Sequence, residues 1–211
     1  MSSDTHPTFQ PKAIIFDLLT ALLDSWTLWN HAAGSPSRGL KWRKAYLELT
    51  YGCGTYRPYE DLVEQSAQQI NLSPEAPRYL LEHWADLKPW PETISVLDQL
   101  RSEGLKIGVV TNCSTELGLR AAQFFPFDAV VTAEGAGYYK PSVKPYEDVL
   151  AELGLQAEDA LFVAGSAADV PGAAGVGMKV VWHNRVGLEA KGAVKPMREA
   201  ESLNEVLRHW L

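Results

Sequence analysis

The hydrophobic pattern of the chain contains five short apolar runs, each of the length of a buried β-strand. Helical patterns, with apolar residues three and four positions apart, follow the first four runs. An alternation of strands and helices is typical of an α/β fold with a doubly wound, Rossmann-like parallel sheet. The expected strands are residues 13–16, 106–110, 128–131, 160–164 and 179–182.

The interval between the first two runs is much longer than the others and carries only helical patterns. We therefore predict a small helical cap, residues 24–87, inserted after the first strand of a core made of residues 10–23 and 88–211. Within this cap, residues 34–37 are expected to form a loop. The expected helices are 25–33, 39–50, 56–70 and 74–86 in the cap, and 91–103, 114–124, 145–153, 169–174 and 202–210 in the core.

Charge and cysteine content argue against several classes of function. The 211 residues include 26 acidic and 19 basic side chains, a net charge of −7, without the basic stripe expected for binding nucleic acid or an anionic membrane. No apolar run approaches the roughly 18 residues of a membrane span. The polar start, residues 1–12, lacks a secretory signal and is expected to be a short flexible tail. The two cysteines form no CxxC pair, so neither a disulfide scaffold nor a cysteine zinc site is expected. We expect a cytoplasmic protein.

Polar side chains follow four of the expected strands. In an open parallel sheet, ligands bind beyond the carboxyl ends of the strands, so these side chains are expected to meet in one crevice. A set that combines two carboxylates, a hydroxyl–amide pair and a lysine is more informative than any member alone. The residues are Asp17, Thr111 with Asn112, Lys140, and Ser166 with Asp169.

Each charged member of this set has a functional and a structural interpretation. A carboxylate directly after a strand, such as Asp17, can act as a nucleophile that forms an ester, or it can cap a turn. Lys140 can keep a nearby carboxylate ionised and hold an anion, or it can be a solvated surface lysine. Asp169 opens a short helix and can combine a capping role with a catalytic one.

These residues resemble the motifs of the haloacid dehalogenase superfamily and, within it, the L-2-haloacid dehalogenases. The resemblance extends from about residue 12 to residue 207. In the cap, Trp42-Arg43 followed by Leu47-Glu48 resembles the helix that carries the arginine of these dehalogenases. The four core motifs are Phe16-Asp17 with Leu22-Leu23-Asp24, Val109-Val110-Thr111-Asn112, Lys140-Pro141 with Tyr146, and Phe162 to Asp169.

The resemblance implies a role for each candidate residue. Asp17 would be the nucleophile, and Arg43 with Asn112 would stabilise the departing group. Asp169 would position or deprotonate the water that cleaves the ester, with Ser166 and Tyr146 in support. The substrate carboxylate would be held by Lys140, by Thr111 and by the backbone amides of Leu18 and Leu19.

Departures from the superfamily's patterns narrow the chemistry. Phosphatases of the superfamily have a general-acid Asp where this chain has Leu19, and leucine cannot protonate a leaving group. They also have a magnesium-binding carboxylate where this chain has Gly165, which leaves the site one oxygen ligand short. We therefore expect neither a metal nor another cofactor. The dehalogenase pattern is altered as well, at Leu19, Thr20, Ala21, Ala164, Ser166 and Ala168.

The sequence thus predicts a metal-independent hydrolase in which Asp17 displaces a leaving group from the α-carbon of a small 2-substituted carboxylic acid, through an ester intermediate. One alternative is the hydrolytic opening of a strained ring, as in aziridine- or azetidine-2-carboxylate. Another is a catalytically inactive protein that binds a ligand. The resemblance further implies a homodimer, and a small carboxylic acid is the only other partner expected.

Overall fold

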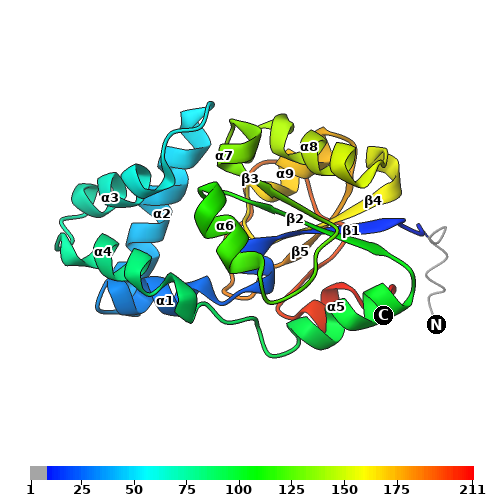
Figure 1. The fold of residues 1–211 in the computed structure, drawn as a ribbon, viewed down its shortest axis with the longest axis horizontal. Helices are drawn as coiled ribbons and strands as arrows, with labels where there is room; N and C mark the ends of the chain where they lie inside the picture. The colour runs from blue at the N-terminus through cyan, green and yellow to red at the C-terminus, as the bar shows by residue number, and fades with distance from the viewer. Residues whose placement is uncertain (1–8) are drawn as a thin grey trace.

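A computed structural model describes residues 9–211, which form one six-stranded, fully parallel sheet with helices on both faces (Figure 1). The strand order is β3-β2-β1-β4-β5-β6. This confirms the predicted α/β class, while residues 1–8 of the predicted tail lie outside the described part. The strands are β1 (Ala13–Asp17), β2 (Lys106–Thr111), β3 (Ala129–Thr132), β4 (Ala160–Ala164), β5 (Lys179–His183) and β6 (Glu199–Ala200).

The central strand β1 is apolar because both of its faces are buried. Ile14 and Phe16 pack in one hydrophobic cluster, and Ala13 and Ile15 pack in the other. Side chains alternate between the faces of a strand, so a strand covered on both sides must be apolar at every position. Asp17, at its carboxyl end, is the first polar residue. The covering helices are α8 (Val143–Leu153) and α9 (Asp169–Gly175) on one side, and α5 (Thr93–Ser102) and α10 (Leu203–Val206) on the other.

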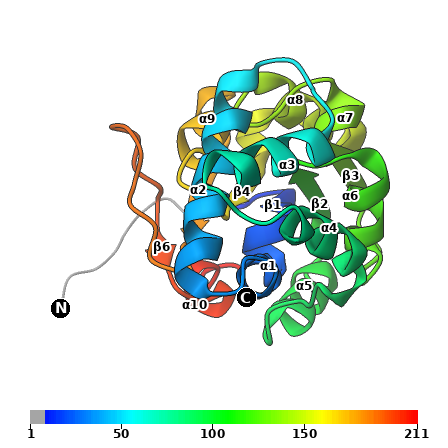
Figure 2. The same ribbon diagram turned by 90° about the vertical axis from the view of Figure 1, so that its left-hand side faces the viewer.

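Five α-helices lie between β1 and β2 in the chain, and the first four belong to residues 24–87, a segment that we call the helical insertion. It lies beyond the carboxyl ends of the strands, at the left of Figure 1 and toward the viewer in Figure 2. Its division from the core as a separate cap domain stays a prediction. The helices are α1 (Ser25–Ala32), α2 (Pro36–Cys53), α3 (Tyr59–Gln69) and α4 (Glu75–Glu82), followed by the short η2 (Trp84–Asp86).

Large aromatic side chains hold the helical insertion together and join it to the core. The rings of Trp29 and Trp42 lie 4.5 Å apart between α1 and α2. The Trp42 Nε1–H donates to the Ser66 hydroxyl at 2.9 Å, which fastens α2 to α3. The Trp84 Nε1–H donates to the Leu117 carbonyl of α6 (Thr115–Ala122) at 2.9 Å. Because these tryptophans are almost fully buried and two of them use their N–H, they fix the helices at defined distances.

Several element boundaries differ from the sequence expectation. Helix α2 begins at Pro36 rather than at 39, because Ser35 caps it by accepting from the Arg38 N–H and proline suits the first helical position. The final helix ends at Val206 instead of continuing to 210. Four short elements were not expected: the π-helix η1 (Leu18–Leu22), the helix α7 (Ala133–Ala136), the 3₁₀-helix η3 (Ala157–Asp159) and the edge strand β6.

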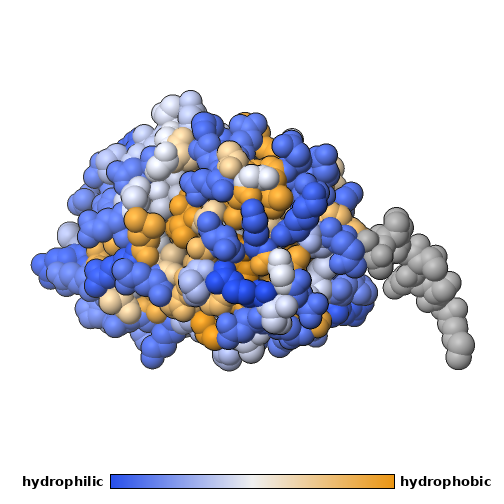
Figure 3. Space-filling view, turned by 45° about the vertical axis from the view of Figure 1, so that its right-hand side comes forward, coloured by the Kyte–Doolittle hydropathy of each residue, from blue (hydrophilic) through white to orange (hydrophobic). Residues whose placement is uncertain are grey.

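The surface is mixed in character. On the face drawn in Figure 3, hydrophobic residues lie among hydrophilic ones. Single exposed hydrophobic side chains are normal on soluble domains and need no partner to explain them. In the part of the chain that the structure describes, no helix is both long and apolar enough to cross a bilayer. The homodimer implied by the resemblance stays a prediction.

Candidate active site

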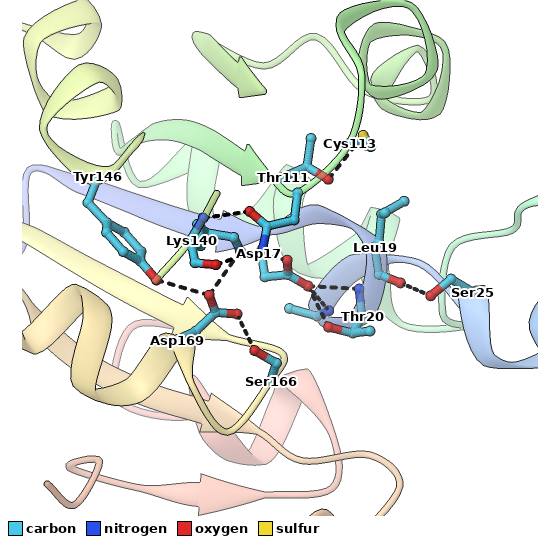
Figure 4. A network of polar contacts seen from close by, with 12 residues as sticks. Asp17, Leu19, Thr20, Ser25, Thr111, Cys113, Lys140, Tyr146, Ser166 and Asp169 are labelled. Carbon is cyan, nitrogen blue, oxygen red and sulfur yellow. Dashed lines mark hydrogen bonds and ion pairs between the residues drawn. The ribbon is translucent and has the colours of Figure 1, made fainter. Parts of the chain in front are cut away.

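Asp17 ends β1, and the turn that follows it saturates one of its two carboxylate oxygens. Oδ2 accepts from the Thr20 N–H at 2.8 Å, the Thr20 hydroxyl at 2.5 Å and the Ala21 N–H at 3.3 Å. The π-helix η1 brings these three donors back over the strand end. Oδ1 accepts from the Lys140 ammonium at 2.8 Å (Figure 4). Oδ1 is therefore the oxygen that keeps room for a substrate atom.

Lys140 lies between two aspartates. Its Nζ is 2.8 Å from Asp17 Oδ1 and 3.0 Å from Asp169 Oδ1, and the side chain is buried. Asn112 fixes the backbone of this lysine, because its Oδ1 accepts the Lys140 N–H at 2.7 Å and its Nδ2 donates to the Lys140 carbonyl at 3.0 Å. Two of the three ammonium donors are thus directed at carboxylates, so at most one is left for a substrate.

The two aspartates differ in their acidity. Burial alone would raise the pKa of Asp17, but the charge and hydrogen bond of Lys140, together with Thr20, bring that pKa below its ordinary value. Burial raises the pKa of Asp169; Lys140 opposes the shift and the negative charge of Asp17 adds to it, so the pKa stays above its ordinary value. Asp17 is therefore suited to be a permanent anion, and Asp169 to take and return a proton.

Asp169 is held in place by two hydroxyl groups besides Lys140. The Tyr146 hydroxyl donates to Oδ1 and the Ser166 hydroxyl donates to Oδ2, both at 3.0 Å. Tyr146 comes from α8 and Ser166 from the loop after β4, so neighbouring core elements converge on one carboxylate (Figure 4). Oδ1 receives two donors and Oδ2 receives one.

Arg43 reaches the same crevice from α2 of the helical insertion. Its Nη1 donates to the Ser25 hydroxyl at 2.8 Å, and its guanidinium carbon lies 4.5 Å from the Trp26 ring centroid and 5.2 Å from that of Trp29. The side chain is 5% exposed, and Nε has no hydrogen-bond partner in the described part of the chain. Among residues 9–211, no carboxylate lies within ion-pair distance of it. Burial lowers the pKa of this arginine, whereas nearby tyrosines and Asp17 oppose that shift.

A narrow cavity of about 30 Å³ joins these groups. It brings together seven of the ten sequence-predicted site residues: Asp17, Leu19, Arg43, Asn112, Lys140, Ser166 and Asp169. Leu18, Thr111 and Tyr146 do not line it. The remaining lining residues are Thr20, Trp26, Tyr46, Leu47, Gly165 and Leu188.

The family model for haloacid dehalogenase-like hydrolases matches residues 14–183, which include the strand ends and the helical insertion. The chain belongs to this family. It is thus a hydrolase of the haloacid dehalogenase type.

Curated relatives and a solved structure cover almost the whole chain. An (S)-2-haloacid dehalogenase of Pseudomonas putida is 26% identical and covers 95% of this chain and 96% of its own. One from Pseudomonas fluorescens is 27% identical over 81% of each chain. A crystal structure of an L-2-haloacid dehalogenase superposes with a TM-score of 0.82 at 25% identity, covering 94% of this chain and 98% of that one. The chain is therefore homologous to L-2-haloacid dehalogenases.

Thr111 lies outside the cavity. Thr111 was expected to bind a substrate carboxylate, but its hydroxyl faces Cys113, 3.5 Å from the Sγ atom, and is fully buried (Figure 4). The Thr111 methyl group also lies near Gly118 of α6. This side chain packs between β2 and α6, and its role in binding a substrate carboxylate stays a prediction.

Thr20 explains one departure from the dehalogenase pattern. The family has threonine four residues after its nucleophile, where this chain has Ala21. Here the hydroxyl comes from the preceding residue, and Thr20 donates to Asp17 through both its N–H and its side chain. A threonine hydroxyl therefore reaches Asp17 from one position earlier in the sequence.

Gly165 leaves the space that this arrangement needs. A Cβ atom at this position would lie 2.2 Å from Thr20 Oγ1 and 2.6 Å from both Asp17 Oδ2 and the Ala21 nitrogen. Real Cβ atoms do not approach other atoms so closely, so no side chain fits here without a backbone shift. The carboxylate that the superfamily's phosphatases use for magnesium cannot be accommodated at this position. Within residues 9–211, no group of three or more His, Cys, Asp or Glu side chains could hold a metal ion.

Besides Gly165 and the apolar residues that line the cavity, four polar residues of the site were not predicted from the sequence. Ser25 bridges the Arg43 guanidinium and the Leu19 carbonyl, and the Tyr46 hydroxyl donates to the Asn112 carbonyl at 2.7 Å. Thr20 and Tyr51 complete the set. The sequence could have indicated two of them by their spacing. Tyr46 and Tyr51 follow Arg43 by three and eight positions, so they share its helix face.

Proposed function

We propose that the protein is a 2-haloacid dehalogenase that replaces the halide of a small 2-haloalkanoic acid with a hydroxyl group through an ester on Asp17. The observation that carries this proposal is the pairing, in one cavity, of an ionised carboxylate with a buried guanidinium that has no carboxylate partner. A buried cation without a counter-ion is costly, so such a site favours an anion. A departing halide meets this requirement.

In the first step, Asp17 Oδ1 attacks the α-carbon, a carbon–oxygen bond forms and the carbon–halogen bond breaks. The three donors on Oδ2 hold the carboxylate plane, so that Oδ1 points into the cavity. Lys140 keeps the carboxylate ionised. Because Lys140 is already shared by two aspartates, we assign the substrate's own carboxylate mainly to the backbone amides of Leu18 and Leu19.

Arg43 stabilises the halide as its negative charge develops. A donor aimed at charge that appears only in the transition state lowers the barrier, often by about 3 kcal/mol. The rings of Trp26 and Trp29 keep water away from the guanidinium, which strengthens this interaction. Asn112 supports the step by holding Lys140.

In the second step, water attacks the carbonyl carbon of the Asp17 ester and gives a proton to Asp169 Oδ2. The bond between the carbonyl carbon and the product oxygen then breaks, and Asp169 returns the proton to that oxygen. The second water proton leaves Asp17 for the solvent, because the pKa of this carboxyl group is low. Asp17 is thereby restored as an anion and a 2-hydroxy acid departs.

A single turnover in H₂¹⁸O tests this proposal. With enzyme in excess over each enantiomer of 2-chloropropionate and EDTA present, we expect lactate whose new hydroxyl oxygen is ¹⁶O, and a peptide containing Asp17 that has gained ¹⁸O. The label enters the enzyme because water attacks Asp17 rather than the substrate. Mass spectrometry measures both species. Lactate that carries ¹⁸O in the first turnover would contradict the ester, and no reaction with either enantiomer would contradict the activity.

Replacing Arg43 with methionine is expected to reduce kcat by about 10²–10³-fold, since the transition state loses its anion-stabilising donor. The folded protein should be as stable as the wild type or more so, because a buried unpaired cation is removed. Steady-state kinetics and urea unfolding measure the two effects. Arg38→Met, on an exposed position of the same helix, is the matched control. Loss of stability together with unchanged kcat would show that Arg43 is merely structural.

A further inference from the structure

Tyr51 connects the helical insertion to the catalytic carboxylate of the core. It lies near the end of α2, and its hydroxyl donates to Ser166 Oγ at 3.3 Å. Ser166 in turn donates its hydroxyl hydrogen to Asp169 Oδ2 at 3.0 Å. A continuous chain of hydrogen bonds therefore runs from the insertion, through a loop of the core, to Asp169.

The oxygen at the end of this chain is the one that the proposed hydrolysis uses. Among residues 9–211, Asp169 Oδ1 already accepts from Lys140 and from Tyr146, whereas Oδ2 accepts only from Ser166. A carboxylate oxygen with a single donor keeps a lone pair for the proton of water. The direction of this free lone pair depends on the orientation of the Ser166 hydroxyl, which occupies the other lone pair of Oδ2.

Ser166 cannot fix its own hydroxyl. A serine hydroxyl rotates freely and is directed by its partners. By accepting a hydrogen bond from Tyr51, Ser166 Oγ is left with its own hydrogen pointing to Asp169, and the two bonds strengthen each other. Burial raises the pKa of Tyr51 to about 12, with the negative charge of Asp169 adding to the shift, so the phenol remains a donor at neutral pH.

The ring of Tyr51 is also held from its other side. The ammonium group of Lys191, from the segment between β5 and β6, lies 4.9 Å from the ring centroid. Leu188 of the same segment lines the cavity. Removing only the hydroxyl of Tyr51 should therefore leave the ring in place, and the hydrogen bond can be tested separately from the packing.

We propose that Tyr51 is a positioning residue for ester hydrolysis, which acts through Ser166 on Asp169 and has no part in the attack by Asp17. This inference rests on the proposed dehalogenase function. It predicts that the two chemical steps respond differently to the loss of one hydroxyl group in the helical insertion. Because this hydrogen bond joins the insertion to the core, ester hydrolysis is fastest when Tyr51 is in contact with Ser166.

The test is a rapid-quench experiment on Tyr51→Phe, with the ester on Asp17 quantified by mass spectrometry. We expect the ester to form at the wild-type rate, within about twofold, and to be hydrolysed about fivefold to tenfold more slowly, the usual effect of one hydrogen bond. The ester should then accumulate. When the second step limits turnover, kcat and KM fall together and kcat/KM is unchanged, a pattern that a loss of folded protein would not produce.

Two further variants make the result specific. Ser166→Ala should slow hydrolysis by a similar factor, and adding Tyr51→Phe to it should have little further effect, because both changes break the same chain. Tyr79→Phe, an exposed tyrosine of α4, should leave both rates unchanged.

The outcomes separate this inference from the function on which it rests. If the wild type forms no ester, the proposed function is wrong. If the wild type forms the ester and Tyr51→Phe hydrolyses it at the wild-type rate, the function stands and the role of Tyr51 is wrong. Slower ester formation with unchanged hydrolysis would equally overturn that role.

Discussion

Replacing Lys140 with methionine is expected to abolish turnover and to destabilise the protein by about 3–5 kcal/mol at neutral pH, the usual cost of removing one partner from a buried ion pair. Two buried carboxylates, Asp17 and Asp169, would remain without the cation that lies 2.8 Å and 3.0 Å from them. Urea unfolding, followed through the fluorescence of the seven tryptophans, measures the loss of stability.

The size of this loss should depend on pH. In the wild type, the lowered pKa of Asp17 contributes stability above its unfolded pKa, and that contribution is lost as the pH falls through the folded value. In the variant, both carboxyl groups would have folded pKa values above their unfolded ones, so stability would decrease as the pH rises. The difference between variant and wild type should therefore be much smaller near pH 4 than near pH 7.

Lys144→Met is the matched control for this experiment. Lys144 pairs with Asp148 one turn along α8, and its side chain is about half exposed. Exposed pairs of this kind contribute about 0–1 kcal/mol, so this variant should behave like the wild type at both pH values. If both substitutions lowered stability equally, or if the loss of stability in Lys140→Met did not change with pH, Lys140 would not be the buried counter-ion of Asp17 and Asp169.

Replacing Asp17 with asparagine is expected to lower kcat by at least about 10⁴-fold, because the nucleophile of a covalent mechanism is removed. No ester should be detected after any reaction time. The asparagine amide group would also meet the donors of Lys140 or Thr20, so some loss of stability is expected. Urea unfolding of the variant, measured beside ester detection by mass spectrometry, separates the chemical effect from a loss of folded protein.

Asp24→Asn makes the same chemical change seven residues further along the chain. Asp24 caps α1 by accepting from the Thr27 N–H and hydroxyl, and asparagine is an equally good cap. In the Asp24→Asn variant, the ester on Asp17 should form and decay as in the wild type. Substantial turnover by Asp17→Asn, with an ester on another carboxylate, would mean that Asp17 is not the nucleophile.

Five strands of the sheet were predictable because both faces of the sheet are buried there and these strands are consequently mostly apolar runs, whereas the short edge strand β6 has no such pattern. The placement of Asp17 and of Ser166 followed from the same fact, since the first polar residue after such a run must lie at the carboxyl edge of the sheet, and Asp169 follows Ser166 by three residues. The parallel order then brings these edges together. The position of Arg43 could not be predicted from the strand pattern, because this residue lies on a helix beyond the sheet. It was predicted only from the resemblance of that helix to the cap helix of the L-2-haloacid dehalogenases.

The remaining parts of the site depend on rotamers, on the type of turn and on tertiary packing, which the hydrophobic periodicity of the sequence does not reveal. Thr111 belongs to a correct motif, but its rotamer directs the hydroxyl to Cys113. Thr20 supplies the hydroxyl expected one residue later, because the turn after β1 is a π-helix and not an ordinary turn. Tyr51 meets Ser166 only through the packing of the helical insertion on the core, a contact between residues 115 positions apart.

The crowding above Asp17 also limits how this protein can evolve. Gly165 faces Thr20 Oγ1 and the backbone of Ala21 at distances that admit no side chain. A single mutation that introduces a carboxylate at 165 would therefore damage the existing site before any new chemistry could be selected. A lineage leading from this chain to a metal-dependent phosphatase must first change the loop after β1 and only then position 165, so the order of the steps is fixed.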